Sequence, residues 1–174
     1  MPGCILGIDP GYERCGYAAI EPRAGRMLLL GSGVLRSSPK LPPAQRLCQI
    51  AEGLDALLML WQPDSVAVEE LFFSRNVKTA MSVAQARGVI LQRSAAAGCA
   101  VAEYTPTTIK SQLTGSGSAD KAQVAFMARR LAEPVSADSI GKLDDELDAI
   151  AVAICHAMRL SIPEPLRRAA EVLR

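Results

Sequence analysis

Histidine is nearly absent from this chain of 174 residues, which contains only His156. A metal centre built from several histidines is therefore excluded. A Ser-His-Asp triad would have to use His156, but this residue stands inside an apolar segment that is typical of a helix. The chemistry of the chain must depend on other side chains.

Cysteine is present but is not arranged for disulfides or for zinc. The five cysteines are an odd number, and no two of them form a C-x-x-C pair. This pattern argues against a disulfide framework and against a thiolate zinc site. We interpret the cysteines as small buried hydrophobic residues of a protein in a reducing cytosol.

Aromatic residues and long apolar runs are also scarce. Aromatic residues make up 4% of the chain, so aliphatic side chains must fill most of its core. No apolar run approaches the roughly 20 residues that cross a bilayer, and the first residues do not resemble a signal peptide. We expect a cytoplasmic protein with one domain over residues 1–160 and a basic, loosely ordered tail at 161–174.

The net charge of +1 conceals an uneven distribution of charge. Between Leu71 and Lys142 there are nine Lys or Arg residues and four Asp or Glu residues. Such a basic region is typical of a protein that binds a polyanion. A mixed, solvated surface remains an alternative explanation of the charge alone.

Hydrophobic patterns predict strands followed by alternating helices and strands. Three closely spaced strands favour an antiparallel meander, and a crossover helix should place the next strand parallel within the sheet. The order predicts an α/β, three-layer fold with a mixed five-stranded sheet flanked by helices. The predicted strands are 4–9, 15–21, 27–35, 65–69 and 100–104, and the predicted helices are 44–60, 77–97, one beginning at 105–106, 119–131 and 145–158.

Four acidic residues stand where such a fold could bring them together. Asp9 and Glu69 each end an apolar strand, while Asp145 and Asp148 open an apolar helix with a spacing that puts both on one helical face. Two carboxylates about 5 Å apart repel each other by roughly 3 kcal/mol at an effective dielectric constant near 20. Divalent cations remove this repulsion, so the pattern predicts a metal site that performs phosphoryl chemistry.

Each acid also has a plainer explanation. The segment Asp9-Pro10-Gly11 can be only a turn, and Glu69-Glu70 can be only a charged strand end. The acids at 144–148 can serve only to complement a helix dipole. The combination of all of them on a suitable strand order favours the metal site.

A series of short motifs resembles the RuvC family of bacterial Holliday junction resolvases, which belongs to the ribonuclease H-like superfamily. The resemblance extends along nearly the whole chain. The G-I-D-P-G motif alone has moderate specificity, because actin-like kinases begin with a similar strand, but the ordered series is much more specific. The series consists of Gly7–Gly11, Gly16-Tyr17, Val68–Phe72, Gln85–Gly88, Gly115–Lys121 and Asp145–Ala151, and it continues to His156.

The resemblance implies that Asp9, Glu69, Asp145 and Asp148 bind two Mg²⁺ or Mn²⁺ ions per active site and direct the hydrolysis of a DNA phosphodiester. Some members of the family have His at the position of Asp145, whereas this chain has the all-carboxylate version. The products should carry 5′-phosphate and 3′-hydroxyl ends.

Two neighbouring acids are less favoured as ligands. Asp144 lacks the three-residue spacing to Asp148, and Glu70 stands one residue beyond the end of its apolar run.

Basic and polar residues near the predicted site have expected roles in binding DNA. Lys121 and Lys110 correspond to lysines that in the family lie near the site, and we expect Lys121 to take part in catalysis by offsetting charge in the transition state. A solvated helix lysine is the alternative for each. Ser118 is the predicted N-cap of the helix after the glycine-containing loop, where free N–H groups could receive a phosphate. The predicted DNA contacts are Phe72, Phe73, Arg75, Asn76, Lys78, Arg87, Lys110, Ser118 and Lys121, with core packing left open for Phe73.

The expected function is the resolution of four-way DNA junctions by paired symmetric cuts in recombination and repair. Two matched cuts call for a twofold homodimer, for which the apolar helix 77–97 is our candidate interface, although it could instead belong to the core of one chain. The resemblance alone implies RuvA and RuvB, a junction-binding protein and a branch-migration motor, as partners. Alternatives are a non-cleaving module that binds branched DNA and a related nuclease that acts on RNA.

Overall fold

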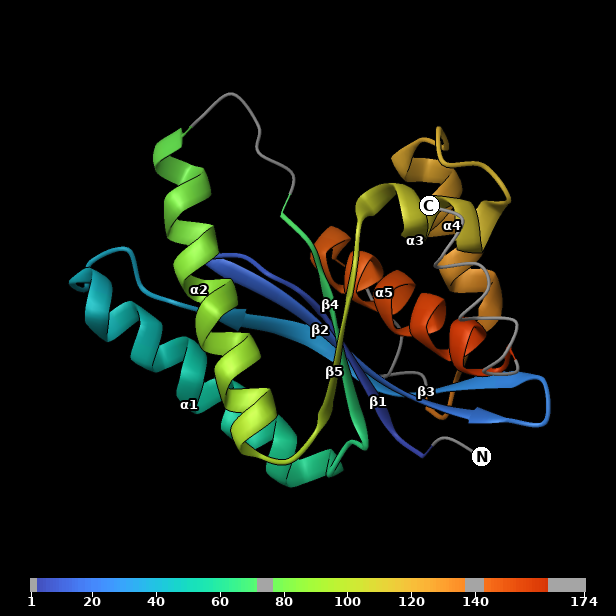
Figure 1. Cartoon of the computed structure of the whole chain (residues 1–174), viewed down its shortest axis with the longest axis horizontal. Coiled ribbons are helices and arrows are strands. Elements are labelled where there is room, and N and C mark those ends of the chain that lie inside the picture. The colour runs from blue at the N-terminus through green and yellow to red at the C-terminus, as the bar shows by residue number, and fades with distance from the viewer. Residues whose placement is uncertain (1–2, 72–76, 137–142, 163–174) are drawn as a thin grey trace.

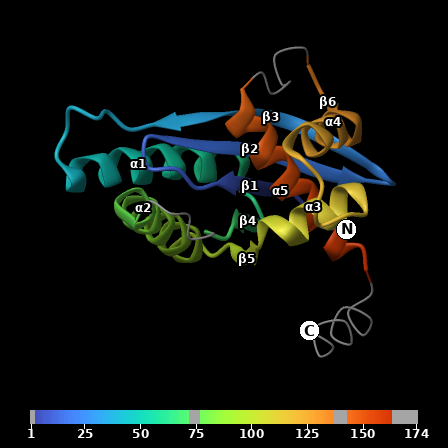
Figure 2. The ribbon, with the colours of Figure 1, turned by 90° about the horizontal axis from the view of Figure 1, so that it is seen from above.

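A mixed β-sheet lies between two layers of helices, which confirms the predicted α/β architecture (Figure 1). The computed structural model describes residues 3–71, 77–136 and 143–162. Two helices, α1 (Pro43–Trp61) and α2 (Val77–Ala96), cover one face of the sheet (Figure 2). Three helices cover the opposite face: α3 (Pro106–Thr114), α4 (Lys121–Leu131) and α5 (Asp144–Leu160).

The first strand, β1 (Ile5–Asp9), occupies the centre of the sheet, whose strand order is β5-β4-β1-β2-β3-β6. It pairs antiparallel with β2 (Arg14–Arg23) and parallel with β4 (Ser65–Glu69). β3 (Arg26–Arg36) completes the antiparallel meander, and β5 (Ala100–Tyr104) pairs parallel with β4. The predicted antiparallel meander and the predicted parallel crossover are both confirmed.

The predicted number of strands is wrong by one. A sixth strand, β6 (Ala132–Pro134), pairs parallel with β3. It has only three residues, follows α4 directly and ends in proline, so the sequence contains no alternating pattern that could reveal it. The predicted bounds of strands 65–69 and 100–104 are confirmed, and the boundaries of the other elements differ by no more than two residues, which is the usual uncertainty at element ends.

Alternation along the strands divides the core between the two faces. Leu6 and Ile8 of β1 pack with the buried side of α1 and α2, whereas Ile5 packs with α3, α4 and α5. Because successive side chains of a strand point to opposite faces, β1 supplies both cores. No helix in the described ranges combines the length and the apolar character needed to cross a bilayer.

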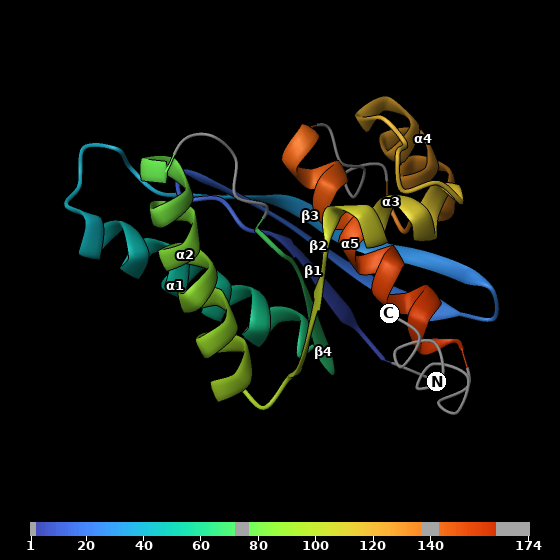
Figure 3. The same ribbon diagram turned by 45° about the horizontal axis from the view of Figure 1, so that its top comes forward.

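Helix α5 lies unusually close to the backbone of the sheet. Its buried positions include a series of alanines, and a Cβ atom added to Gly7 of β1 would stand 2.7 Å from the Cβ and the N of Ala153. A Cβ atom added to Gly16 of β2 would meet the backbone carbonyl of Asp145. The two glycines therefore allow the helix to rest on β1 and β2, which fixes the position of its first turn (Figure 3).

We expect Gly7→Ala to destabilise the protein by about 1–3 kcal/mol, because the new methyl group overpacks against helix backbone that cannot yield. Gly88→Ala is the matched control, since Gly88 lies within α2 and an added Cβ would meet nothing within 4 Å. The control should be neutral or stabilising by about 0.5–1 kcal/mol, because alanine favours helix over glycine. Chemical denaturation of both variants measures the difference, and equal effects would show that α5 can move away from β1.

Candidate active site

Asp9 and Glu69 lie side by side at one edge of the sheet. They end β1 and β4, which are parallel neighbours with Ile8 opposite Val68, so both carboxyl groups emerge at the same edge. The two side chains are hydrogen-bonded to each other. Two carboxyl groups can form such a bond only when one of them holds a proton.

Asp145 and Asp148 come to the same edge from the first turn of α5. Their side chains are 26% and 30% exposed, whereas that of Asp144 is 77% exposed. The charges of Asp148 and Asp145 both raise the pKa of Asp9. The structure therefore supports the choice of Asp145 over Asp144 as the residue that faces the other acids.

Burial and mutual repulsion raise the pKa values of Asp9, Glu69 and Asp148. Burial is the largest cause for Asp9, followed by the charges of Asp148 and Asp145. Burial also leads for Glu69, followed by the charges of Asp9 and Asp148. The pKa of Asp148 is raised by burial as well, against the opposing effect of Lys121. The carboxyl groups of the cluster are therefore difficult to ionise all at once, and a bound divalent cation would make their ionisation easier.

Among the described residues, Lys121 is the positively charged side chain that contacts Asp148 directly. Its Nζ lies 3.0 Å from Oδ2 of Asp148 and 3.4 Å from Oδ2 of Asp144. Burial lowers the pKa of Lys121, but the hydrogen bond and charge of Asp148 outweigh this effect and raise it. Lys121 is therefore held protonated beside the acids.

A cavity of about 260 Å³ joins both predicted lysines to the acids. Glu69, Asp148, Lys110 and Lys121 line it, together with apolar side chains from α3, α4 and α5. Charged groups of both signs thus share one partly enclosed space, in which electrostatic interactions are stronger than in water.

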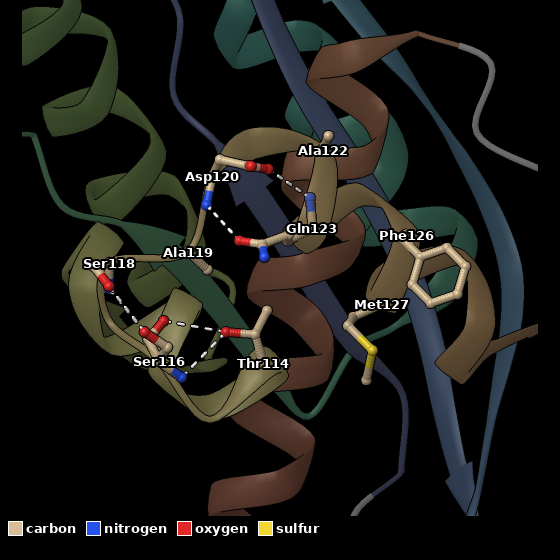
Figure 4. Close-up of a pocket in the computed structure, with 9 residues that line it drawn as sticks. All are labelled: Thr114, Ser116, Ser118, Ala119, Asp120, Ala122, Gln123, Phe126 and Met127. Atoms are coloured by element: carbon tan, nitrogen blue, oxygen red, sulfur yellow. Dashed lines mark hydrogen bonds between the residues drawn. The ribbon is translucent and has the colours of Figure 1, made fainter.

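Ser118 does not cap α4 as predicted. Asp120 is the N-cap: its Oδ1 accepts the N–H of Gln123 at 2.8 Å, and Gln123 Oε1 accepts the N–H of Asp120 at 2.9 Å (Figure 4). The reciprocal bonds between Asp120 and Gln123 form a capping box, so the prediction of Ser118 as the cap is wrong. Ser118 instead bonds to Ser116 at 2.9 Å, beside a cavity of about 610 Å³ that is separate from the acid cluster.

Arg14 is a residue of the site that the sequence did not suggest. Its Nε donates to Oδ2 of Asp145 at 2.6 Å, and a terminal nitrogen also contacts that oxygen. The signal was available, because the short turn after Asp9 places the first residues of an antiparallel β2 beside the end of β1. Arg14 thus binds Asp145 and Lys121 binds Asp148, the two acids of α5 that face the site.

Of the remaining predicted DNA contacts, the structure describes the side chain of Arg87 alone. Phe72, Phe73, Arg75 and Asn76 lie outside the described residues, and Lys78 belongs to α2 with a side chain that also lies outside them. Arg87 forms an ion pair with Glu103 of β5, and its Nε is buried without a hydrogen-bond partner.

His156 is buried at the other end of the helix from the acids. Its Nδ1 lies 2.6 Å from the hydroxyl of Tyr104, and its Nε2 lies 3.1 Å from that of Ser65. The residue therefore joins α5 to β4 and β5.

The donor set suits a hard divalent cation, because it consists of carboxylate oxygens. The side chains do not already form a coordination sphere: in the described ranges, no three acidic, His or Cys side chains are arranged to hold one ion. The contacts of Asp145 with Arg14 and of Asp148 with Lys121 account for this arrangement. Binding a cation requires these two carboxylates to turn.

Acids at the adjoining ends of β1 and β4 and in the first turn of α5, on a sheet of this order, define a nuclease of the ribonuclease H-like class. The family model for crossover junction endodeoxyribonuclease RuvC matches residues 5–156, and the chain belongs to this family. RuvC of Syntrophomonas wolfei is 47% identical over 152 residues, which cover 87% of each chain. RuvC of Heliobacterium modesticaldum is 47% identical over 157 residues, covering 90% of this chain and 95% of that protein. The structure of Thermus thermophilus RuvC in complex with a Holliday junction substrate matches with a TM-score of 0.82 and 33% identity, covering 91% of this chain and 94% of that chain.

The raised pKa values predict that Mg²⁺ stabilises the protein more at high pH. In chelator, the stability that the protonated Asp9 and Glu69 provide is present below their ordinary pKa values and is lost as pH rises through the raised ones. The gain in Tm on adding Mg²⁺ should be larger at about pH 8.5 than at about pH 6, by at least the 2–4 °C that about 1 kcal/mol produces in a chain of this size. Thermal unfolding at both pH values measures it.

The control is the double variant Asp9→Asn, Glu69→Gln, in which the gain should be small and independent of pH. An equal gain at both pH values in the unmodified protein would contradict the assignment of these acids.

Proposed function

We propose that this chain is a structure-selective endonuclease that resolves four-way DNA junctions by hydrolysing phosphodiester bonds. The observation that carries the proposal is the convergence of Asp9, Glu69, Asp145 and Asp148 from two strands and a helix, with Lys121 bound to one of them. Membership of the RuvC family supports the choice of substrate.

The four carboxylates would hold two divalent cations, Mg²⁺ or Mn²⁺, whose positive charge would stabilise the reacting phosphate and assist the attack of water. The role of the protein is to keep four negative groups together despite their repulsion. Burial at the sheet edge and the close approach of α5 accomplish this, because neither the strand ends nor the first helical turn can move apart without disrupting the core.

Lys121 and Lys110 would act on the phosphate directly. Both line the 260 Å³ cavity with Glu69 and Asp148, and the contact with Asp148 keeps Lys121 protonated. A protonated amine at this position can offset the charge that grows on a phosphate oxygen in the transition state. We assign a catalytic role to Lys121 and binding of the DNA backbone to Lys110.

Other DNA contacts would come from the segment after β4 and from the helices beside it. Phe72, Phe73, Arg75, Asn76 and Lys78 remain candidates by their position in the sequence, with the aromatic rings suited to stacking on unpaired bases. Arg87 could reach DNA only by leaving Glu103. Ser118 lies on the exposed loop before α4, near Lys121.

A homodimer would supply the two sites that paired symmetric cuts need. Among the α2 residues whose side chains the structure describes, Ala86, Ile90 and Ser94 form the one buried stripe, while Met81 is 59% exposed. We propose that α2 forms the dimer contact. A branch-migration complex of RuvA and RuvB would deliver the junction to the enzyme. The nuclease domain would end near residue 160, before a basic tail. The protein would act in the cytoplasm.

A non-cleaving module that binds branched DNA is the main alternative. It would bind the junction equally well with the acid cluster altered and would never cut it. A related nuclease that acts on RNA would instead prefer substrates with a 2′-hydroxyl group.

Cleavage of a synthetic mobile four-way junction tests the proposal. We expect Glu69→Gln and Asp9→Asn to retain junction binding and to lose at least about 100-fold in the single-turnover cleavage rate, the loss typical of removing one preorganised electrostatic group. Glu70→Gln is the matched control and should cut at the normal rate. Normal cutting by Asp9→Asn, or undiminished cutting in chelator, would refute the proposed site.

The dimer is tested separately by Met81→Glu, which places a charge on the exposed side of α2. Analytical ultracentrifugation should show a shift toward monomer of about tenfold or more in Kd, because a buried unpaired charge is costly at an interface. Met59→Glu on α1 is the control, since Met59 is 79% exposed and lies outside the proposed contact. Equal behaviour of the two variants would move the interface away from α2.

A further inference from the structure

Arg14 forms an ion pair across the active site that joins two distant parts of the chain. It is the first residue of β2, and its partner Asp145 is the second residue of α5, 131 residues away. The position is set by backbone packing rather than by a flexible side chain, because Gly16 of β2 lies directly beneath the backbone of Asp145. The backbones of the two residues are therefore held close together, which keeps the guanidinium within reach of this carboxylate.

Both guanidinium contacts reach the same oxygen, Oδ2 of Asp145. Nε donates a charge-assisted hydrogen bond to this oxygen and a terminal nitrogen contacts it, so a divalent cation that takes the oxygen would have to displace the guanidinium, whose charge repels it. The arginine side chain is 41% exposed, and such ion pairs are weak enough to be exchanged. Arg14 and a cation consequently compete for Asp145.

The released guanidinium would remain at the edge of the site. Arg14 pairs with Arg36 of β3, and β2 pairs with β1 from Gly16 onward, so the backbone at Arg14 stays beside the end of β1. Once cations neutralise the four carboxylates, the strongest nearby anion for Arg14 is the phosphate backbone of the bound DNA, to which arginine can donate two parallel hydrogen bonds.

We infer that Arg14 is a positioning residue that exchanges partners: it binds Asp145 until a divalent cation takes that carboxylate, and it then binds a backbone phosphate of the junction. This inference rests on the proposed function. It makes cation binding and DNA binding favour each other, since each ligand takes one partner of the same ion pair, and such coupling is reciprocal.

Arg14→Gln tests the exchange, with Arg23→Gln as the matched control. Arg23 lies at the other end of β2 and forms a comparable exposed ion pair with Glu21. Mn²⁺ binding to the DNA-free protein is measured by calorimetry. Arg14→Gln should bind Mn²⁺ about two- to fivefold more tightly, because the competitor is removed, while Arg23→Gln should match the unmodified protein.

The salt dependence of junction binding provides a second readout that a purely structural role would not change. It is measured once with Ca²⁺ and once with chelator. With Ca²⁺, the slope of log K against log salt should be smaller for Arg14→Gln by about 0.9, the value for one lost phosphate contact. With chelator, the slopes for Arg14→Gln and for the unmodified protein should agree. Arg14→Lys keeps the charge and should keep the slope of the unmodified protein, whereas Arg14→Ala replaces the glutamine variant if that variant does not fold.

The outcomes separate the inference from the proposed function. Unchanged Mn²⁺ affinity in Arg14→Gln overturns the competition, and an unchanged slope with Ca²⁺ overturns the phosphate contact. If the unmodified protein binds no Mn²⁺ and cuts no junction, the proposed function itself fails. Tighter Mn²⁺ binding together with the smaller slope supports the exchange.

Discussion

The close contact between α5 and the central strands is the constraint on which the site depends. Gly7 and Gly16 remove the side chains that would separate the helix from β1 and β2, and the alanines of α5 bring its backbone down onto them. The first turn of the helix is therefore held above the ends of the strands. Without this contact, Asp145 and Asp148 would not reach the edge at which Asp9 and Glu69 emerge.

Bringing four carboxylates together has an electrostatic cost that this structure distributes among several partners. Asp9 and Glu69 bond to each other, Lys121 binds Asp148, and Arg14 binds Asp145. Each of these arrangements is weaker than the bond of a carboxylate to a divalent cation. The cluster is thus stable enough to fold and still open to exchange, which is a useful combination for a site that must bind both metal ions and DNA.

The sequence predicted the fold and the four acids because both depend on local patterns. Apolar runs that end in Asp9 and Glu69 mark strand ends, and the D-x-x-D spacing marks a helical face. It did not reveal β6, which is too short to have a pattern, or Arg14, whose role arises only when β2 is paired and α5 is docked. The cap of α4 was assigned to Ser118 instead of Asp120, although Gln123 stands three residues after Asp120, which is the spacing of a capping box.

The sheet separates two hydrophobic cores that share almost no side chains. The acids of α5 and the lysines of α3 and α4 depend on one core, while α1 and α2 depend on the other. Substitutions in one layer should therefore be nearly additive with those in the opposite layer. Natural substitutions could change α1 and α2, together with any partner that they bind, while the acids and lysines of the site stay unchanged.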